Sequence, residues 1–543
     1  MTGNPIWRWF DNTFLDLGRQ FRWSYLPPLM VYLAAGVQGL TAIVGTFFIK
    51  EYLDLTAAFL AGLAFWAGIP WTLKMPIGHL VDLIWRRKAL LVYLGASLIT
   101  ASILIMYGVI AHTAAMDAVL PVEAWFVIAT ILAPTGYVLQ DVVADAMTVE
   151  AVPTIDEHGN PYPQRDIKIM HTTMQTLGRV AIIGGLVAVA MLNVTMFDGV
   201  EDMSEETKIG VYANIYLLAL IIPVISITGV ILGGILLRRR ARQMEALGHD
   251  HSSIDKLLFA PEMETHPNWW ILGGSLAYAL FTITMGVSDV PLAQEIIFVG
   301  STGIILFLMY RLLLELDASA RNMLIGTAII IFVFRATPLP GPGVAWFEID
   351  VLGFDQQFLS VLSLIGAALT LVGMFVLRPM MAKRSIAFVI VVLTIAAAVL
   401  SLPNIGLYYG IQEWTAAHTG GIVDARFIAI IDTALESPLG QIAMIPMLAW
   451  IAQNAPPHLK ATFFAVMASF TNLALSAASL GTRYVNEFYT VTREVRDRVT
   501  DVIESSANYS ELGWLLISVT LIGFCAPLIT VFLIQHSPLR TRQ

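Results

Sequence analysis

The chain has 543 residues, of which 57% are hydrophobic and only 13% are charged, with a formal net charge of −9. Soluble domains carry about 25% charged residues, so the composition excludes an ordinary soluble protein. The apolar residues form runs long enough to cross a bilayer as helices, without the alternation typical of a transmembrane β-barrel. The sequence therefore predicts an all-α polytopic membrane protein.

The chain has a single cysteine, Cys525, inside its last apolar run. One cysteine excludes an internal disulfide and a cysteine-based metal cluster. The motifs GxxxxGK[ST], HExxH and CxxC are missing as well, so we expect no enzymatic activity, no cofactor, no metal and no nucleic-acid partner. The N-terminus lacks the short apolar region of a cleavable signal peptide, and the first span is expected to direct insertion.

The apolar runs predict fourteen transmembrane spans. They lie at about 26–50, 55–74, 88–111, 122–150, 168–195, 211–237, 268–289, 291–314, 321–349, 356–378, 385–409, 424–452, 460–487 and 511–536. An even number of spans places both termini on one side of the membrane. Segments on that side hold 22 of the 31 Lys and Arg residues, Lys74 among them. The positive-inside rule therefore predicts a cell (inner or plasma) membrane protein with both termini in the cytoplasm.

An internal repeat relates two distant segments. Phe47–Phe65 aligns with Trp346–Leu364 at an offset of 299, which places Glu51 on Asp350. Each segment follows the first span of a six-span half, and two such parallel halves are typical of major-facilitator transporters. We therefore expect a major-facilitator fold of two six-helix bundles with an inserted helical hairpin. The two spans of the hairpin are left out of the numbering, so 321–349 is the seventh span, 424–452 the tenth and 460–487 the eleventh. Its parts are an N-terminal segment 1–25, a first bundle 26–240, a linker 241–267, the hairpin 268–316, a second bundle 317–537 and a tail 538–543.

Two spans carry pairs of acidic residues. Asp141 and Asp145 lie four residues apart in the fourth span, and Asp432 and Glu436 repeat this spacing in the tenth, so each pair shares one helical face. A carboxylate at membrane depth costs about 2.5–3.5 kcal/mol on insertion scales, and such groups usually face a bundle interior or a wet cavity. Paired buried carboxylates can exchange protons near neutral pH, which predicts proton coupling. The alternative is a structural ion pair with an arginine of a neighbouring helix.

Two arginines lie inside apolar spans, Arg179 in the fifth and Arg335 in the seventh. A desolvated guanidinium needs an acidic partner or an anionic ligand. The sequence leaves open substrate contact and an internal salt bridge such as Arg179 with Asp141. Thr337–Gly343, with three prolines and two glycines, must break the seventh span, either beside the translocation path or as a simple external cap.

Polar side chains in the first, fourth and eleventh spans are candidates to line the same cavity. They are Gln38, Tyr137 and Asn472. Each of them alone is more often engaged in an interhelical hydrogen bond.

The loop between the second and third spans carries Gly78, Asp82, Arg86 and Arg87, a loosened form of the facilitator loop pattern. The glycine permits close approach of helix ends, Asp82 can cap a helix N-terminus, and the arginines can pair with Glu150. These five residues would form a conformational latch that releases as the halves move. The alternative is a basic loop that only fixes topology.

The segment Val31–Asp82 resembles the folate–biopterin transporter family. The family's motifs correspond to Gln38-Gly39, Lys50–Leu55 and Pro70–Asp82, and Leu139–Ala151 and Ala461–Leu473 are similar to its fourth-span and eleventh-span motifs. The predicted central hairpin departs from the twelve spans of that family.

This resemblance implies a secondary transporter that moves a folate-like or pterin-like anionic solute by alternating access, with proton symport. Its partners would be the solute, protons and the lipid bilayer, and we expect a monomer. Muropeptide permeases are an alternative, since Gln140–Ala146, Arg179 and Leu435–Ala443 also fit that family. The second alternative is a non-transporting membrane scaffold or sensor with the same fold.

Overall fold

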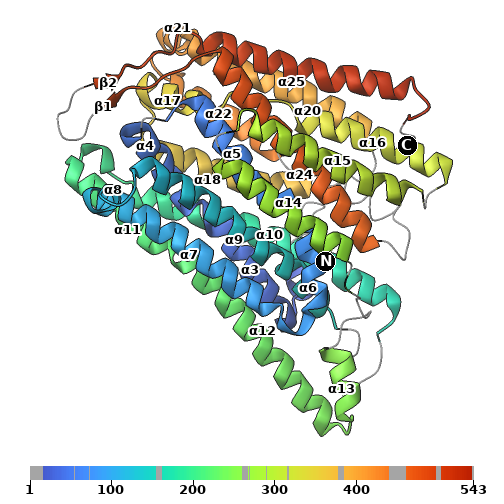
Figure 1. Ribbon diagram of the computed structural model, residues 1–543. Helices are drawn as coiled ribbons and strands as arrows, with labels where there is room; N and C mark the ends of the chain where they lie inside the picture. Colours follow the sequence, from blue (N-terminus) through green and yellow to red (C-terminus); the bar gives the residue numbers. More distant parts are fainter. Residues whose placement is uncertain are drawn as a thin grey trace, which may run out of the picture.

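The computed structural model describes residues 16–53, 55–72, 74–153, 162–259, 267, 269–288, 290–314, 317–376, 385–439, 460–496 and 503–540 (Figure 1). The described residues are almost entirely helical. The exception is a two-stranded antiparallel ribbon of β1 (Val495–Arg496) and β2 (Ile503–Ser505), in which Val495 lies opposite Ser505.

Helices occupy all six positions expected for spans of the first half. They are α3 (Leu26–Val37), η3 (Gln38–Thr41) and α4 (Ala42–Tyr52); α5 (Ala57–Thr72) and α6 (Lys74–Leu83); α7 (Ala89–Ala111); α9 (Val122–Ala151); α10 (Gln164–Met196); and α11 (Glu205–Ala219) with α12 (Ile221–Ala246). Short helices connect or flank them: α2 (Asp16–Arg19), η2 (Trp23–Tyr25), η4 (Trp85–Arg87), α8 (Thr113–Asp117), η5 (Val200–Asp202) and α13 (His251–Leu258).

The hairpin and the second half follow the same plan. The hairpin is α14 (Trp269–Val287) and α15 (Ala293–Leu313). The second half has α16 (Ala318–Arg335), α17 (Gly343–Asp350), α18 (Gln356–Val376), α20 (Ile386–Tyr408), α21 (Ile411–His418), α22 (Ala425–Glu436), η6 (Ser437–Leu439), α24 (Lys460–Phe488) and α25 (Leu512–Gln535). Within the described ranges, nine helical stretches are long and apolar enough to cross a membrane, which agrees with a polytopic helical protein.

One predicted boundary is wrong, and the error matters for the site. The second span was expected to end at residue 74, but the apolar helical stretch runs from Ala57 to Leu83. Pro70 lies inside α5 without ending the stretch. The extra residues place Lys74 inside a helical stretch that is long and apolar enough to cross a membrane, and not in a loop after it.

Helices α7 and α9 pack at backbone distance because two glycines face each other. A Cβ atom built on Gly95 would lie 2.5 Å from the carbonyl oxygen of Gly136, and the reverse contact has the same length. No side chain fits between the helices at that distance. The pair of glycines therefore fixes α9, which carries Asp141 and Asp145, against α7.

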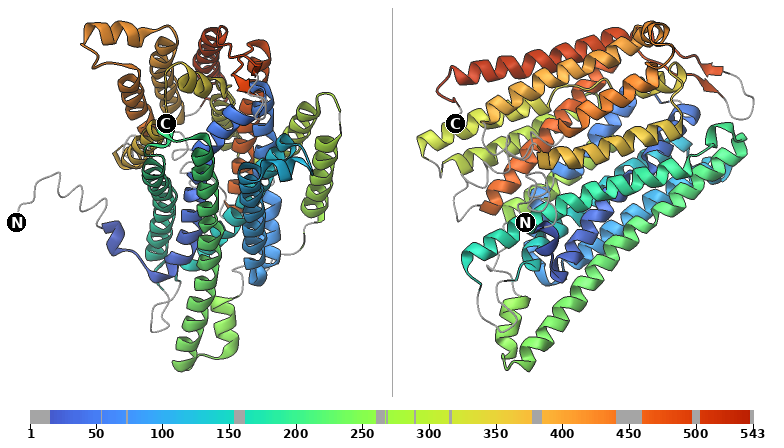
Figure 2. Two further views of the ribbon diagram at one scale, coloured as in Figure 1. Left: turned by 90° about the vertical axis from the view of Figure 1, so that its left-hand side faces the viewer. Right: turned by 180° about the vertical axis from the view of Figure 1, so that it is seen from behind.

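The two halves contact each other most extensively through two helix pairs, α5 with α24 and α10 with α18, and smaller contacts join α6 with α24 and α4 with α18. Figures 1 and 2 show the two sets of helices closest together at the end that carries α17, β1 and β2, and farther apart toward α13. At the close end, Gln356 Nε2 donates to Tyr212 Oη at 2.8 Å, and Gln357 Nε2 donates to Asp198 Oδ1 at 3.0 Å. These bonds join the start of α18 to the first half.

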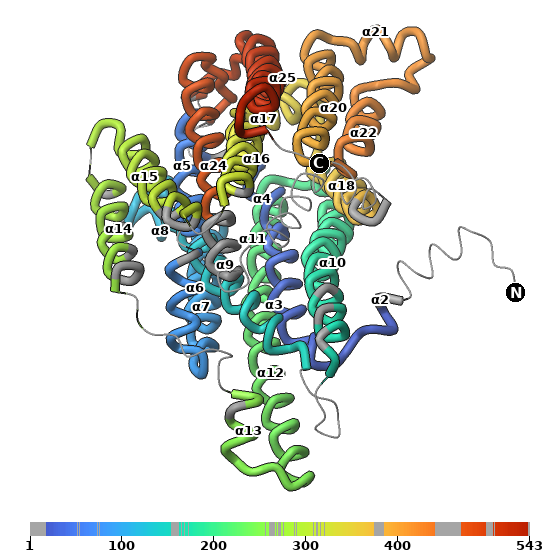
Figure 3. The backbone as a smooth tube through the Cα atoms, turned by 90° about the vertical axis from the view of Figure 1, so that its right-hand side faces the viewer, coloured from blue at the N-terminus to red at the C-terminus, as the bar shows by residue number. Residues whose placement is uncertain are grey.

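The hairpin packs along the boundary between the halves, beside α5 and α24 (Figure 3). Gln294 of α15 contacts both of them. Its Nε2 donates to the carbonyl oxygen of Gly62 at 3.2 Å, and its Oε1 accepts from Arg483 Nη1 at 3.1 Å. The inserted hairpin is thus attached to both bundles.

The proline-rich segment breaks the seventh span as the sequence predicts. Helix α16 ends at Arg335 and α17 begins at Gly343. The freed backbone groups bond to side chains of α24: the Leu339 N–H donates to Thr482 Oγ1 at 2.9 Å, and Asn486 Nδ2 donates to the Pro340 carbonyl at 3.1 Å. The broken backbone therefore packs against protein at this point, which is one of the two environments that tolerate it.

Candidate functional site

The two acids of the fourth span share one lysine. Lys74 Nζ, at the start of α6, lies 2.6 Å from Asp141 Oδ2 and 2.8 Å from Asp145 Oδ2 of α9. The i, i+4 spacing places both carboxylates on one face of α9, as predicted from the sequence. The alternative of an ion pair with an arginine of a neighbouring helix is not formed within the described residues, because the helix that continues the second span brings Lys74 to both carboxylates.

A tyrosine completes the cluster from a third helix. Tyr32 of α3 donates from its hydroxyl to Asp145 Oδ1 at 2.7 Å. Its ring packs against Gly178 of α10, where a Cβ would lie 2.9 Å from the ring. We call Tyr32, Lys74, Asp141 and Asp145 the lysine–carboxylate cluster. Sequence reasoning missed Tyr32 and Lys74.

The cluster is partly accessible rather than sealed. The exposed fractions of the side chains are 24% for Lys74, 19% for Asp141 and 48% for Asp145. With both carboxylates ionised, one positive and two negative charges leave an excess negative charge. One proton would neutralise that excess, so the arrangement is suited to binding and releasing a proton.

Arg179 lies near the cluster but outside its ion pairs. Its side chain is exposed on α10, within electrostatic range of Asp141 and Tyr32. Among the described residues, no ion pair joins Arg179 to Asp141, so the internal salt bridge considered from the sequence is not formed. An exposed guanidinium beside this cluster can meet an anionic ligand.

The acids of the second half have a different environment. Asp432 is buried, and its Oδ2 accepts from Asn404 Nδ2 of α20 at 2.9 Å, whereas its Oδ1 has no hydrogen-bond partner in the described ranges. Glu436, one turn later, is exposed. Glu348 of α17, which sequence reasoning missed, lies within electrostatic range of Asp432. No ion pair with a base involves these carboxylates within the described part of the chain.

The remaining candidate ligands are distributed over several helices. Arg335 is half-buried at the end of α16, and its Nε has no hydrogen-bond partner in the part of the chain that the structure describes. Gln38 is exposed in η3, and Tyr137 is half-buried one turn before Asp141 on α9. Asn472 of α24 donates to the Trp71 carbonyl of α5 at 3.1 Å. Asn472 therefore forms an interhelical hydrogen bond, which the sequence left open as the alternative to lining the cavity. This bond connects the two halves.

The expected pairing of the predicted latch is wrong. Glu150 pairs with Lys88 at 3.0 Å and not with Arg86 or Arg87. The turn η4 directs Arg86 outward to Asp255 of α13, at 2.6 Å, while the Lys88 ammonium lies 3.9 Å above the Trp85 ring.

Two other members of the predicted latch lie on α6. Gly78 faces Val142 of α9, since a Cβ would lie 3.9 Å from its side chain, and Asp82 is exposed. The corresponding loop of the second half, 378–384, lies outside the described residues, as does part of the segment 435–443.

A second charged group joins the halves beside α17, and sequence reasoning missed it. Lys50 of α4 forms an ion pair with Asp350, which also accepts from the Tyr509 hydroxyl. The nearly buried Arg493 donates to the carbonyls of Lys50 and Leu55 at 2.9 and 2.6 Å. Its guanidinium lies 4.5 Å from the centre of the Trp346 ring. We call Lys50, Asp350, Arg493 and Tyr509 the α17 interlock.

Lys50 and Asp350 belong to the two segments of the internal repeat, so the interlock joins equivalent parts of the two halves. That shared membership was the one signal in the sequence that could have suggested the contact.

Comparison with solved structures identifies the fold. The chain is similar to a POT family transporter in complex with 5-aminolevulinic acid, with a TM-score of 0.61 and 13% identity, covering 97% of each chain. It is also similar to a mutant of the nucleoside transporter NupG, with a TM-score of 0.52 and 12% identity, covering 96% of this chain and 99% of that one. These likenesses confirm the predicted major-facilitator fold.

Comparison of sequences identifies the family. The chain is 21% identical over 475 residues to the folate-biopterin transporter of Synechocystis sp., which covers 87% of this chain and 76% of that protein. The model of the BT1 family matches residues 35–542. The predicted resemblance and the prediction of a transporter rather than an enzyme are confirmed: this chain is a multi-pass membrane transporter that belongs to the BT1 family.

Proposed function

We propose that this transporter moves a folate-like or pterin-like solute by alternating access, coupled to the movement of protons. The solute class is supported by the similarity to the folate-biopterin transporter of Synechocystis sp.. The coupling is supported by the lysine–carboxylate cluster, which is the observation that carries the proposal.

The coupling follows from the charge of the cluster. While Asp141 and Asp145 are both ionised, Lys74 compensates only one of them, and the excess charge attracts a proton. Protonation of one carboxylate weakens its attraction for Lys74 and changes the electrostatic field at Arg179. Asp432 and Glu436 are proposed as a second proton site, because one oxygen of the buried Asp432 has no partner.

Binding of an anionic solute is assigned to Arg179 and Arg335. A planar carboxylate matches the fork of a guanidinium, and the partly unpartnered Arg335 and the exposed Arg179 are suited to this contact. Gln38 and Tyr137 are proposed to line the same path. Asn472 is proposed to contribute only when its bond to Trp71 opens.

Alternating access requires contacts that open at one end while others close. The α17 interlock joins the halves at the end where the helices are closest together. The Lys and Arg distribution assigns this end to the external side, so the state described is proposed to be inward-facing, with both termini in the cytoplasm. The segment around Gly78, Asp82, Arg86, Arg87 and Glu150 is then proposed as the cytoplasmic latch, with Lys88 in place of an arginine as the partner of Glu150.

Proteoliposomes test the solute and the coupling together. Purified protein is reconstituted with an imposed pH gradient, and uptake of labelled folate and biopterin is measured against an anhydromuropeptide. We expect the pterin compounds to be taken up, faster when the gradient drives protons in the same direction. Asp141→Asn should abolish the response to the gradient. Asp117→Asn, at an exposed position of α8, is the matched control and should retain it.

Two results would contradict separate parts of the proposal. Preferential uptake of the anhydromuropeptide would contradict a folate-like or pterin-like solute and favour a cell-wall fragment instead. Pterin uptake that is equal with and without a gradient in both the wild type and Asp141→Asn would remove proton coupling while leaving the solute class intact.

A further inference from the structure

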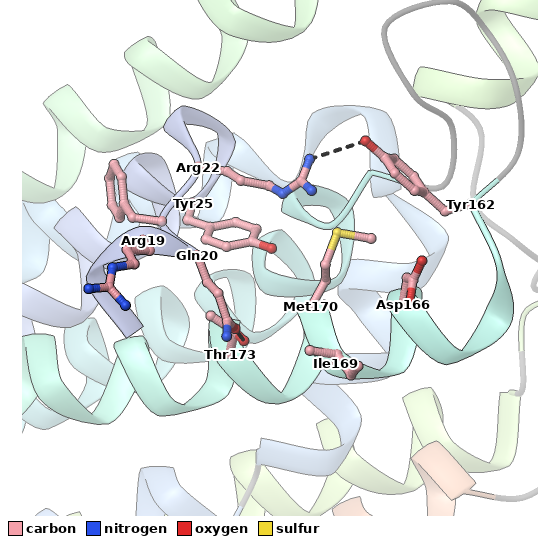
Figure 4. Close-up of a pocket in the computed structure, with 10 residues that line it drawn as sticks. Arg19, Gln20, Arg22, Tyr25, Tyr162, Asp166, Ile169, Met170 and Thr173 are labelled. Carbon is pink, nitrogen blue, oxygen red and sulfur yellow. Dashed lines mark hydrogen bonds between the residues drawn. The ribbon is translucent and has the colours of Figure 1, made fainter. Parts of the chain in front are cut away.

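A cavity of about 450 Å³ lies where the first span begins, between η2 and the first turns of α10 (Figure 4). This volume falls within the range of about 300–1,000 Å³ that is typical of small-molecule sites. None of the residues that line it belongs to the lysine–carboxylate cluster. It is lined by Arg19, Gln20, Phe21, Arg22, Tyr25, Tyr162, Asp166, Ile169, Met170 and Thr173.

The wall of the cavity offers hydrogen-bond donors that need an acceptor. Tyr25 is fully buried, and its hydroxyl has no hydrogen-bond partner among the described residues. A buried donor without a partner is costly, so an acceptor in the cavity would be stabilised. Arg22 Nη1 makes only a long 3.4 Å bond to the Tyr162 hydroxyl, and its guanidinium lies 5.4 Å from that ring. Figure 4 shows Arg22 and Tyr25 side by side.

The charge of the lining favours a ligand with a single negative charge. Arg19 and Arg22 contribute two positive charges, and the exposed Asp166 contributes one negative charge. The remaining polar pair is already satisfied, since Thr173 donates to Gln20 at 2.6 Å. A phosphodiester, which carries one charge and several acceptor oxygens, suits this set of donors.

The rim of the cavity is apolar and faces outward. Phe21 is 38% exposed and Ile169 is 47% exposed, while the neighbouring Trp23 is 73% exposed. The membrane-crossing stretch Trp23–Lys50 starts at this point. Exposed aromatic side chains at the end of a span are typical of the membrane interface. A ligand here would therefore have its polar group in the cavity and apolar chains along Phe21 and Ile169.

We propose that this cavity binds the phosphodiester group of an anionic phospholipid. Arg19, Arg22 and the Tyr25 hydroxyl donate to the phosphate oxygens, and the acyl chains lie over Phe21 and Ile169. A zwitterionic lipid would place an additional ammonium beside the two arginines and should bind less well. The bound lipid would join the start of α3 to the start of α10.

Native mass spectrometry of the full-length protein in detergent tests the site. Phosphatidylglycerol and phosphatidylcholine with identical acyl chains are titrated in parallel, and inorganic phosphate and glycerol phosphate serve as soluble competitors. We expect the wild type to retain phosphatidylglycerol preferentially. Hydrogen bonds to charged groups are worth enough that Arg19→Gln/Arg22→Gln should lower the affinity about tenfold or more. Tyr25→Phe should lower it by about threefold.

Arg165→Gln is the matched control, because Arg165 is an exposed arginine at the start of α10 that does not line the cavity. It should retain phosphatidylglycerol as the wild type does. Thermal unfolding without added lipid verifies that each variant is folded. Equal retention of the two lipids by the wild type, or unchanged retention by Arg19→Gln/Arg22→Gln, would overturn the proposal. Displacement by inorganic phosphate without any preference between lipids would also overturn it, in favour of a soluble phosphate ligand.

Discussion

Lys74 lies between two carboxylates that one helix carries a single turn apart. The three side chains are only partly exposed, so water screens their charges less than it would at a surface. Removal of the lysine would leave two negative charges close together without a counter-charge. Removal of one carboxylate would leave a balanced pair. The three residues should therefore respond to substitution unequally.

This inequality predicts the outcome of a double-mutant cycle. Lys74→Met should destabilise the protein by about 2 kcal/mol. Breaking a fully buried ion pair costs about 3–5 kcal/mol, and the loss is smaller here because the three side chains are partly exposed. A second substitution, Asp141→Asn, should restore part of the loss because it removes one of the repelling charges. Thermal unfolding in detergent measures both effects. Lys208→Met, at a lysine of α11 that has no ion pair within the described ranges, should unfold at the wild-type temperature. If Lys74→Met unfolds at the wild-type temperature, Lys74 does not stabilise the protein by balancing the two carboxylates.

The sequence predicted one part of this cluster and missed the other. The face shared by Asp141 and Asp145 follows from helical geometry alone. Their partner does not, because the proline and the basic residue at the end of the second apolar run looked like a loop, whereas the helical stretch continues to Leu83. A hydropathy pattern locates spans well, but it does not show how far a polar helix end continues inside the protein.

At the scale of elements, the α17 interlock connects segments far apart in the chain. Arg493 follows α24, yet it donates to the carbonyl of Lys50 in the last turn of α4 and to that of Leu55 in the connection between α4 and α5. Both carbonyls lie where α4 ends and the chain turns into α5. The repeat showed that the two segments are equivalent, but no spacing in the sequence indicated that they touch.

Arg493→Ala should therefore loosen the connection between α4 and α5. The loss of both donors leaves two carbonyls without a partner, and amide hydrogen exchange in the segment 53–60 should become several-fold faster, as measured by mass spectrometry. Arg426→Ala is the control, because Arg426 bonds to the Gly353 carbonyl and Asp355 entirely within the second half. If exchange in 53–60 is as slow in Arg493→Ala as in the wild type, the interlock does not hold this connection.

At the scale of the whole molecule, the proposed alternating access requires the two bundles to separate where they now lie closest together. The bond between Gln357 and Asp198 is one of the contacts that would have to open. The chain's one cysteine, Cys525, is exposed on the outer helix α25, so it can be replaced without disturbing this region. In a protein without its own cysteine, a cross-link between two introduced cysteines then tests one chosen contact.

We expect a covalent link across this contact to stop transport. In a Cys525→Ser background, Asp198→Cys/Gln357→Cys treated with a short, cleavable thiol cross-linker should lose uptake in proteoliposomes, and cleavage of the linker should restore it. The control pair is Asp355→Cys/Arg426→Cys, which replaces a 2.7 Å ion pair inside one bundle. Its uptake should survive cross-linking. Full uptake by the linked Asp198–Gln357 pair would contradict a rocking of the two bundles.

The close approach of Gly95 and Gly136 has a mechanical consequence. It fixes α9, which carries both carboxylates, against α7. Lys74 instead belongs to the stretch of α5 and α6, which packs on α9 of its own bundle and also on α24 of the other, and Asn472 holds Trp71 three residues before it. A displacement of the second bundle would therefore act on the lysine more directly than on its acidic partners. In that way the movement of the two bundles would change the affinity of Asp141 and Asp145 for protons.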